Sequence, residues 1–384
     1  METTAPPRGI GATLRCDPAA PWRHLDWPLL GATLAIAGLG VLMVWSATRT
    51  AMADAGLDPA TYLKRQLAFV VLGAVVMAVV VTIDYHSYRD FAPIGYLGAL
   101  ALLVLVLSPL GTEVRNAQSW FAIGSFQLQP AELAKLALII TLAACGASAG
   151  GTLDRQRLMV SLGIAGVPVA LVLMQPDLGS ALVLVAILAG MLVVAGTRPR
   201  HLAALTAAAV LAVIAVFQLD LVDSYQRERL TDFARSGDTS TGSGFQSEQA
   251  ETAIGAGGLF GAGLFEGTQT KLGFVPEQQT DFIFTVVGEE LGFAGSATLV
   301  LLYGVIVWRV WRTAQLSRDL YGTLVCAGVL AMLLFQVFEN MGMSMGLMPI
   351  TGLPLPLMSY GGSSMLTTWA ALGLVLNVHM RRFS

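Results

Sequence analysis

The stretch DLGSALVLVAILAGMLVVAG, residues 177 to 196, decides the class of this fold. After Asp177 it holds no charged side chain, and it is as long as the roughly 20 apolar residues that a helix needs to cross a bilayer. Lipid offers no hydrogen-bond partner to a free backbone, and a spanning barrel strand would be about half as long. The stretch is therefore predicted to be a transmembrane helix, with Asp177 as a candidate cap at its start.

The remainder of the chain repeats this pattern. Of its 384 residues 55% are hydrophobic and 12% are charged, and the mean hydropathy is +0.68. We expect an all-α integral membrane protein with about ten transmembrane helices, which form a single polytopic membrane domain over residues 28–384. The candidate spans are residues 28–47, 66–83, 91–109, 131–148, 157–174, 177–196, 201–219, 282–308, 321–346 and 359–379.

Basic residues indicate which ends of the spans face the cytoplasm. With the N-terminus inside, cytoplasmic segments hold 13 of the 22 Lys and Arg residues, and the short outer loops hold four. Both termini are therefore predicted to be cytoplasmic, with residues 1–27 as a disordered tail. Residues 220–281 are expected to form a large extracytoplasmic loop between the seventh and eighth helices. Its ten acidic and four basic residues are compatible with a divalent cation as cofactor but establish none.

Other classes of site leave no trace in the sequence. The three cysteines, Cys16, Cys145 and Cys326, lack metal-like spacing. No nucleotide-binding motif is present, and no basic surface of the kind that binds nucleic acid.

Charged side chains inside a span cost about 2.5 to 3.5 kcal/mol each at the helix centre, so each needs an explanation. Glu132 and Lys135 are three residues apart and share one helix face. They could neutralise each other as an ion pair, or Lys135 could face an anionic group of a substrate. Glu339 and Asn340 in the ninth span are candidate hydrogen-bonding residues between helices.

Asp281, in EQQTDFIF (277–284), stands at the start of the eighth span. On a continuous helix it would lie about 80° from Glu289, so both carboxylates could face one cavity. A carboxylate at a water-accessible membrane mouth can serve as a general base, or it can simply complement the positive end of the helix dipole. Trp120 is likewise typical of the aromatic belt at a membrane interface.

Four long motifs occur in order along the chain: RNAQSWFAIGSFQLQPAELAKLALI (115–139), QPDLGSALVLV (175–185), GTQTKLGFVPEQQTDFIFTVVGEELGFAGS (267–296) and NMGMSMGLMPITGLPLPLMSYGGSS (340–364). Together they resemble the SEDS family, the shape, elongation, division and sporulation proteins of bacteria. The resemblance runs from the first span to the tenth. Within the family, PITGLPLPLMSYGGSS and GTQTKLGF are more similar to RodA than to FtsW.

The resemblance implies a peptidoglycan glycosyltransferase that polymerises lipid II at the outer face of the bacterial cytoplasmic membrane, during cell elongation and shape maintenance. Asp281 matches the family's essential aspartate, which is implied to deprotonate or position the acceptor hydroxyl. Gln279 stands where the family commonly has histidine, so we assign it no acid or base role. The expected substrate-binding residues are Arg65, Trp120, Glu132, Lys135, Glu277, Glu289 and Ser359. Among them, Lys135 or Arg65 is the expected cation for a diphosphate leaving group.

The resemblance also implies a partner, a class B penicillin-binding protein with transpeptidase activity. Its single span could pack on the small residues Gly292, Ala294 and Gly295. Three alternatives stay open: a division-type paralogue similar to FtsW, a lipid II flippase or other transporter, and a noncatalytic scaffold. A transporter would also need buried charges along a cavity, but it would not need a carboxylate at the outer mouth.

Overall fold

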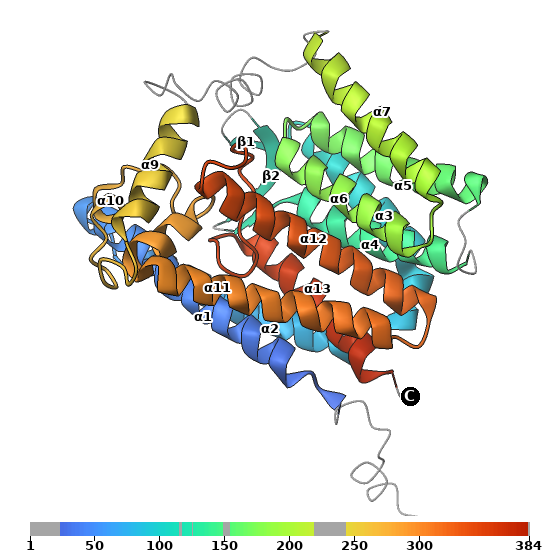
Figure 1. The fold of residues 1–384 in the computed structure, drawn as a ribbon, viewed down its shortest axis with the longest axis horizontal. Coiled ribbons are helices and arrows are strands. Elements are labelled where there is room, and N and C mark those ends of the chain that lie inside the picture. The colour runs from blue at the N-terminus through green and yellow to red at the C-terminus, as the bar shows by residue number, and fades with distance from the viewer. Residues whose placement is uncertain (1–23, 115–116, 125, 149–153, 219–242, 383–384) are drawn as a thin grey trace, which may run out of the picture.

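The computed structural model describes residues 24–114, 117–124, 126–148, 154–218 and 243–382. Nearly all of the predicted tail (1–27) and the first part of the predicted outer loop (220–281) lie outside the described residues. In the described residues, ten long helices form the body of the molecule, and Figure 1 shows their arrangement. They are α1 (Trp27–Asp54), α2 (Thr61–Thr82), α3 (Tyr85–Val106), α4 (Pro130–Ala147), α5 (Arg155–Leu173), α6 (Leu178–Val194), α7 (Pro199–Gln218), α11 (Ile283–Leu316), α12 (Leu320–Ser344) and α13 (Gly362–Met380).

Each predicted span corresponds to one of these helices, so the integral membrane fold is confirmed. Seven of the described helices, α1 to α5, α11 and α12, are long and apolar enough by themselves to cross a membrane, and the shorter α6 is also apolar. Many apolar side chains on α2 and α3, among them Val71, Val75 and Leu97, are exposed on the outside of the bundle. Such a surface is stable where lipid covers it.

Local sequence explains several helix starts. Pro130 is the first residue of α4, where its missing N–H removes no helical hydrogen bond. Asp177 caps α6 as predicted, because its Oδ1 accepts a hydrogen bond of 2.9 Å from the amide of Ser180.

The structure adds elements that the sequence did not predict. A small antiparallel sheet of order β1-β2-β3 lies between α3 and α4 and consists of β1 (Thr112–Val114), β2 (Ala117–Ile123) and β3 (Phe126–Leu128). The helices α9 (Ser243–Ala256) and α10 (Thr268–Leu272) lie in the second part of the predicted outer loop. Figure 1 shows α9 and α10 at one end of the bundle and the C-terminus at the other.

The start of α1 and the ends of α11 and α13 meet at the end of the bundle that holds the C-terminus. The carboxylate of Asp26 accepts two hydrogen bonds of 2.9 Å from Nε of Arg309, and His379 lies 3.8 Å away. Because the helices alternate in direction, α4, α6, α11 and α13 begin at the opposite end. Residues next to those helix starts therefore gather there.

Loop 345–361, between α12 and α13, enters the bundle at that opposite end. Its residues Leu353, Leu355, Leu357 and Met358 are buried. Helices surround it: the hydroxyl of Tyr303 on α11 donates to the carbonyl of Pro356 (2.6 Å), while Gln66 of α2 donates to that of Ser359. A loop with free backbone groups is tolerated at this depth because protein, not lipid, encloses it.

Candidate active site at one end of the bundle

Asp281 lies in a tight turn that precedes α11. The turn begins at Glu277, whose φ is 55°, and the Glu277 carbonyl accepts hydrogen bonds of 3.1 Å from the amides of Thr280 and Asp281. The N-cap of α11 is Phe282 and the helix begins at Ile283, so Asp281 is not the capping residue. The angle of about 80° to Glu289, which assumed a continuous helix, therefore does not apply.

Asn340 of α12 holds this turn in place through two hydrogen bonds. Its Nδ2 donates to the carbonyl oxygens of Asp281 (2.7 Å) and Leu353 (2.8 Å), which joins the turn to loop 345–361. The sequence predicts that Asn340 bonds between helices, whereas the structure shows it bonding from α12 to the turn before α11 and to loop 345–361. The partly exposed Asp281 carboxylate lies against Gly352, because a Cβ on Gly352 would stand 3.5 Å from its Oδ2. Gly352 also has a φ of 72°, which disfavours any larger residue.

Arg65 of α2 reaches the same turn through Tyr360. The side chains of Arg65 and Tyr360 are hydrogen-bonded, and the amide of Tyr360 donates to the carbonyl of Gln279 (2.8 Å). Tyr62 packs edge-to-face on Tyr360 with ring centroids 4.9 Å apart. Tyr360 thus links an exposed guanidinium on α2 to the turn that carries the partly exposed carboxylate. Sequence reasoning missed Tyr360 and Gly352, although both lie within the motif 340–364.

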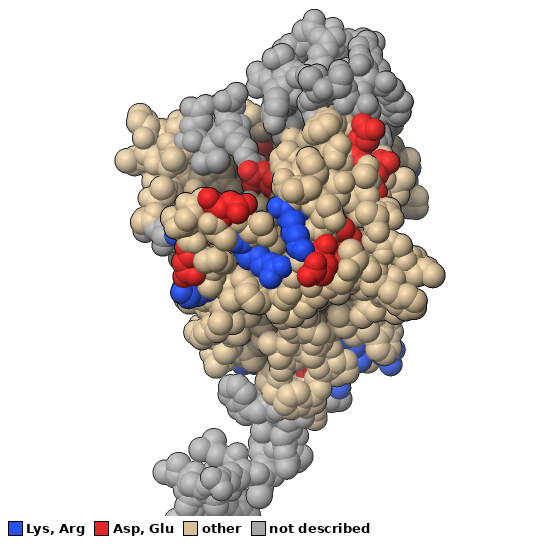
Figure 2. Space-filling model, turned by 90° about the vertical axis from the view of Figure 1, so that its left-hand side faces the viewer, with Lys and Arg blue, Asp and Glu red and all other residues tan. Residues whose placement is uncertain are grey.

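The surface at this end carries charge. Figure 2 faces the end of the bundle where α9 and α10 lie, and it shows acidic and basic side chains close together in the middle of this face, with further charged side chains toward its edges. Lys271 and Glu266 form an exposed ion pair of 2.8 Å there, and Lys271 lowers the pKa of the Glu266 carboxyl. Among the described residues, no group of three or more His, Cys, Asp and Glu side chains could hold a metal ion.

Glu132 and Lys135 form a fully buried ion pair on α4. The Lys135 ammonium lies 2.7 Å from Oε1 of Glu132, and the Lys135 side chain has 0% exposure. The geometry agrees with mutual neutralisation, and a substrate could reach Lys135 only if the surrounding helices moved.

Three further predicted residues take part in local structure. The Ser359 hydroxyl, which is buried, accepts a hydrogen bond of 2.8 Å from the amide of Leu355 and so shapes loop 345–361. Glu277 accepts long hydrogen bonds from Gln279 (3.4 Å) and Thr280 (3.3 Å) within the turn of Asp281. Trp120, half-buried on β2, pairs with Thr112 of β1.

Glu289 binds protein backbone. Its Oε1 accepts from the amide of Gln269 (2.7 Å), and its Oε2 accepts from the amide (2.9 Å) and hydroxyl (2.6 Å) of Thr270. The carboxylate, which is buried, therefore caps the start of α10. This corrects the expectation that Glu289 shares an open cavity with Asp281.

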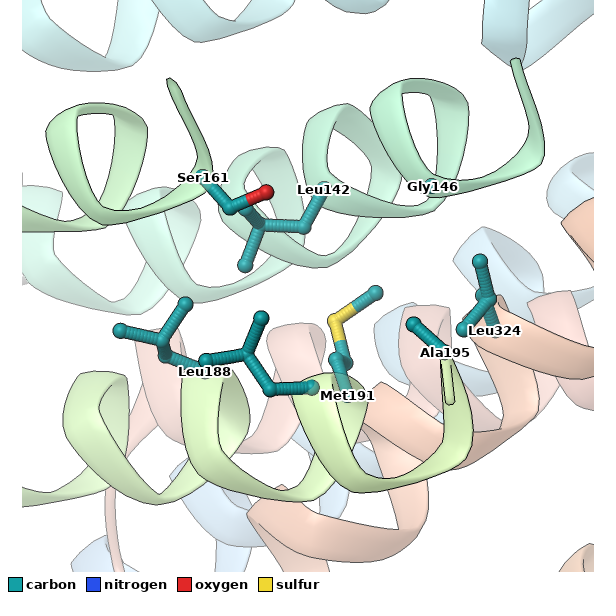
Figure 3. A pocket seen from close by; sticks show the side chains of 8 residues that line it. Leu142, Gly146, Ser161, Leu188, Met191, Ala195 and Leu324 are labelled. Carbon is teal, nitrogen blue, oxygen red and sulfur yellow. The ribbon is translucent and has the colours of Figure 1, made fainter. Parts of the chain in front are cut away.

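A small apolar pocket lies away from these residues, between α4, α5, α6 and α12 (Figure 3). It is lined by Leu142, Gly146, Ser161, Leu188, Met191, Leu192, Ala195 and Leu324. These residues belong to the end of the bundle opposite Asp281, and none of them is titratable. The pocket is therefore not the candidate active site.

Known proteins share this sequence and fold. The family model "Cell cycle protein", which covers FtsW, RodA and SpoVE, matches residues 27–383. The stage V sporulation protein E of Bacillus subtilis (strain 168) is 38% identical over 92% of this chain and 96% of its own length. The probable peptidoglycan glycosyltransferase FtsW of Thioalkalivibrio sulfidiphilus (strain HL-EbGR7) is 42% identical over 93% of this chain and 90% of its own.

Solved structures agree. The rod shape determining protein RodA of Thermus thermophilus has 33% identity and a TM-score of 0.70, with 94% of this chain and 99% of that chain covered. A chain from the work "Structural coordination of polymerization and crosslinking by a peptidoglycan synthase complex" has 34% identity and a TM-score of 0.78, covering 93% and 98%. The chain therefore belongs to the FtsW, RodA and SpoVE family of cell cycle proteins, the SEDS family that its motifs resemble.

Proposed function

We propose that this chain is a peptidoglycan glycosyltransferase that polymerises lipid II into glycan strands at the outer face of the cytoplasmic membrane. The observation that carries the proposal is the placement of Asp281. Its carboxylate is partly exposed at one end of a membrane-spanning bundle, in a turn fixed by Asn340 and beside Gly352. Relatives named as peptidoglycan glycosyltransferases support the same activity.

The proposed reaction joins two lipid-linked sugars. A hydroxyl oxygen of the acceptor attacks the anomeric carbon of the donor, the bond from that carbon to the diphosphate breaks, and undecaprenyl diphosphate leaves. Asp281 takes the hydroxyl proton as general base. Arg65 on α2 is exposed and interacts with Tyr360, which bonds to the turn of Asp281, so it stabilises the charge of the leaving diphosphate more directly than the buried Lys135. The remaining predicted residues contribute by maintaining the shape of the site: Trp120, Glu132, Glu277, Glu289 and Ser359.

The test replaces Asp281 with Asn, which removes the charge and keeps the shape. Purified wild type and Asp281→Asn receive labelled lipid II, and glycan polymer is measured by gel. We expect no detectable polymer from the variant, together with a thermal midpoint close to that of wild type. Asp54→Asn, an exposed carboxylate at the end of α1, serves as control and should polymerise normally. Polymerisation at the wild-type rate by Asp281→Asn would reject Asp281 as the general base. Loss of polymerisation in both Asp281→Asn and Asp54→Asn would show that the effect is not specific to Asp281.

The same assay separates the transporter alternative. A flippase moves lipid II without making polymer, so polymer formation by the purified wild type would exclude an exclusively transporting role. A scaffold would make no polymer and would tolerate Asp281→Asn in the cell.

The cellular role is a finer part of the proposal. The resemblance of PITGLPLPLMSYGGSS to RodA favours cell elongation, whereas the relatives named FtsW favour the division-type paralogue as the second candidate. Depletion of the protein distinguishes them, because loss of elongation gives rounded cells and loss of division gives filaments.

The proposed partner is a class B penicillin-binding protein, in line with the coupling of polymerization and crosslinking described for the similar complex. The small-residue surface expected for its span needs correction. A Cβ on Gly292 would stand 2.3 Å from the amide nitrogen of Gly261, so Gly292 already packs within the chain. Gly292 is therefore not part of the proposed contact, which is left with the exposed Ala294 and the partly exposed Gly295.

A further inference from the structure

Helix α11 is broken shortly after its start. Gly292 has φ 65° and ψ −161°, which is not a helical conformation, so residues 283–291 form a separate helical piece of about two and a half turns. This piece begins two residues after Asp281. A break in a membrane helix frees backbone groups that lipid cannot satisfy.

Residues 257–272, which we call the strap, satisfy these groups. The amides of Ala262 and Gly263 donate to the carbonyls of Glu289 (2.9 Å) and Glu290 (3.1 Å). On the other side of the break, the amide of Phe293 donates to the carbonyl of Gly258 (2.9 Å), and that of Ala294 donates to Leu259 (3.0 Å). The strap thus replaces the hydrogen bonds that a continuous helix would make within itself.

Glycines permit this close approach. A Cβ on Gly257 would stand 1.9 Å from the carbonyl oxygen of Gly288, and one on Gly261 would stand 2.1 Å from that of Glu290. Gly255, two residues before the strap, has no atom within 4 Å of such a Cβ. Gly257 and Gly261 therefore pack against α11, whereas Gly255 does not.

Side chains lock the strap at two further points. Glu289 caps α10 inside the strap through three hydrogen bonds. On the α1 side, Arg49 donates to the carbonyl of Phe265 (2.9 Å) and lies over its ring, and Glu290 accepts a hydrogen bond from Ser46. The piece 283–291 is thereby attached to the strap and to α1, while the break separates it from the rest of α11.

We propose that the strap positions Asp281 for catalysis, with Gly257 as a packing contact and Glu289 as a positioning residue that does not touch substrate. This inference rests on the proposed function, because it concerns the placement of the same carboxylate. A displaced strap lets the piece 283–291 shift and moves the carboxylate relative to the acceptor hydroxyl. Displacement of a reacting group by about 1 Å can reduce a rate on the order of 100-fold.

The test compares three alanine variants in the lipid II polymerisation assay. Gly257→Ala forces the strap away from α11. Gly255→Ala, near the end of α9 just before the strap, adds the same methyl group without a clash. Gly190→Ala places its Cβ 2.5 Å from that of Ala331, between α6 and α12 far from the site. We expect kcat to fall by about 10- to 100-fold in Gly257→Ala with little change in KM. Gly255→Ala should match wild type, and Gly190→Ala should lower the thermal midpoint without lowering kcat.

Glu289→Gln is the second variant, in case Gly257→Ala does not fold. Because the amide keeps only one acceptor oxygen, it weakens the cap on α10, and we expect kcat to fall while KM for lipid II stays the same. A rise in KM with unchanged kcat would make Glu289 a substrate contact and overturn the proposal. Wild-type kcat in both Gly257→Ala and Glu289→Gln, or an equal loss in Gly190→Ala, would overturn it too.

Asp281→Asn is measured alongside. If Asp281→Asn is inactive while the strap variants are fully active, the proposed function stands and the strap inference fails. If Asp281→Asn remains active, the catalytic assignment itself fails, and the inference fails with it.

Discussion

Lys135 shows how one buried charge can be stabilised and still be open to a second role. Its ammonium is 2.7 Å from Glu132, and both side chains are buried among apolar neighbours on α4. Removing one member of such a pair leaves an uncompensated buried charge, whereas removing both does not. A double variant therefore distinguishes a purely structural pair from a Lys135 that also contacts substrate, because only in the first case can it restore both stability and polymerisation.

We expect Lys135→Met to destabilise the protein by about 3 to 5 kcal/mol, and Glu132→Gln/Lys135→Met to recover most of that loss. Thermal unfolding in detergent measures the stability, and lipid II polymerisation is assayed on the same samples. If the double variant regains both stability and polymerisation, the pair is structural. Recovery of stability alone would show that Lys135 also serves the substrate.

Tyr360 offers a second prediction for a single side chain. Tyr360→Phe keeps the ring but removes the hydroxyl that is hydrogen-bonded to Arg65. A hydrogen bond to a charged group contributes about 1.5 to 3 kcal/mol, so kcat/KM for lipid II should fall at least about tenfold. Tyr62→Phe retains the packing on Tyr360 and should polymerise normally. An unchanged rate in Tyr360→Phe would mean that Arg65 needs no such support.

Between elements, the contact of α1 with loop 345–361 decides how deeply the loop can lie. A Cβ on Gly40 would stand 2.7 Å from Cα of Met358, whereas one on Gly38 would meet nothing within 4 Å. Both glycines lie on α1, where alanine is the better helix former. Alanine variants at the two positions therefore share the same gain in helix propensity and differ only in their packing against the loop.

Gly40→Ala is expected to cost about 1 to 3 kcal/mol through overpacking against the loop backbone. Gly38→Ala should leave the thermal midpoint unchanged or raise it. Thermal unfolding of the two variants and wild type provides the comparison. Equal midpoints for both variants would show that the loop moves aside without cost.

For the molecule as a whole, the proposed sidedness assigns the Asp281 end to the outside. Asp54 at the end of α1 lies at that end, and Arg318, between α11 and α12, lies at the other; both are exposed. In a chain whose cysteines are replaced, Asp54→Cys should react with a membrane-impermeant maleimide in spheroplasts. Arg318→Cys should react only after permeabilisation. The reverse pattern would place the candidate site in the cytoplasm and exclude polymerisation on the outer face.

Length and hydropathy alone predicted the ten long helices, but not α9 and α10. The run at 177–196 became α6 with Asp177 as its cap, because both features depend on neighbouring residues and on the absence of water in lipid. The motif around Asp281 singled out that residue as the candidate base, and Glu132 and Lys135 were recognised as neighbours on one helix face. Local chemistry was sufficient for the helix, its cap and the ion pair, whereas the role of Asp281 as a base stays a prediction that rests on the family resemblance.

Tertiary structure decided the rest. The break at Gly292 and the burial of loop 345–361 are invisible in sequence, because the backbone groups involved are satisfied by segments distant in the chain or by helices around them. The same holds for Glu289, which the helical period placed beside a cavity with Asp281 and whose carboxylate instead caps α10. Which polar groups meet depends on how the helices pack, and the period of a single helix cannot specify that.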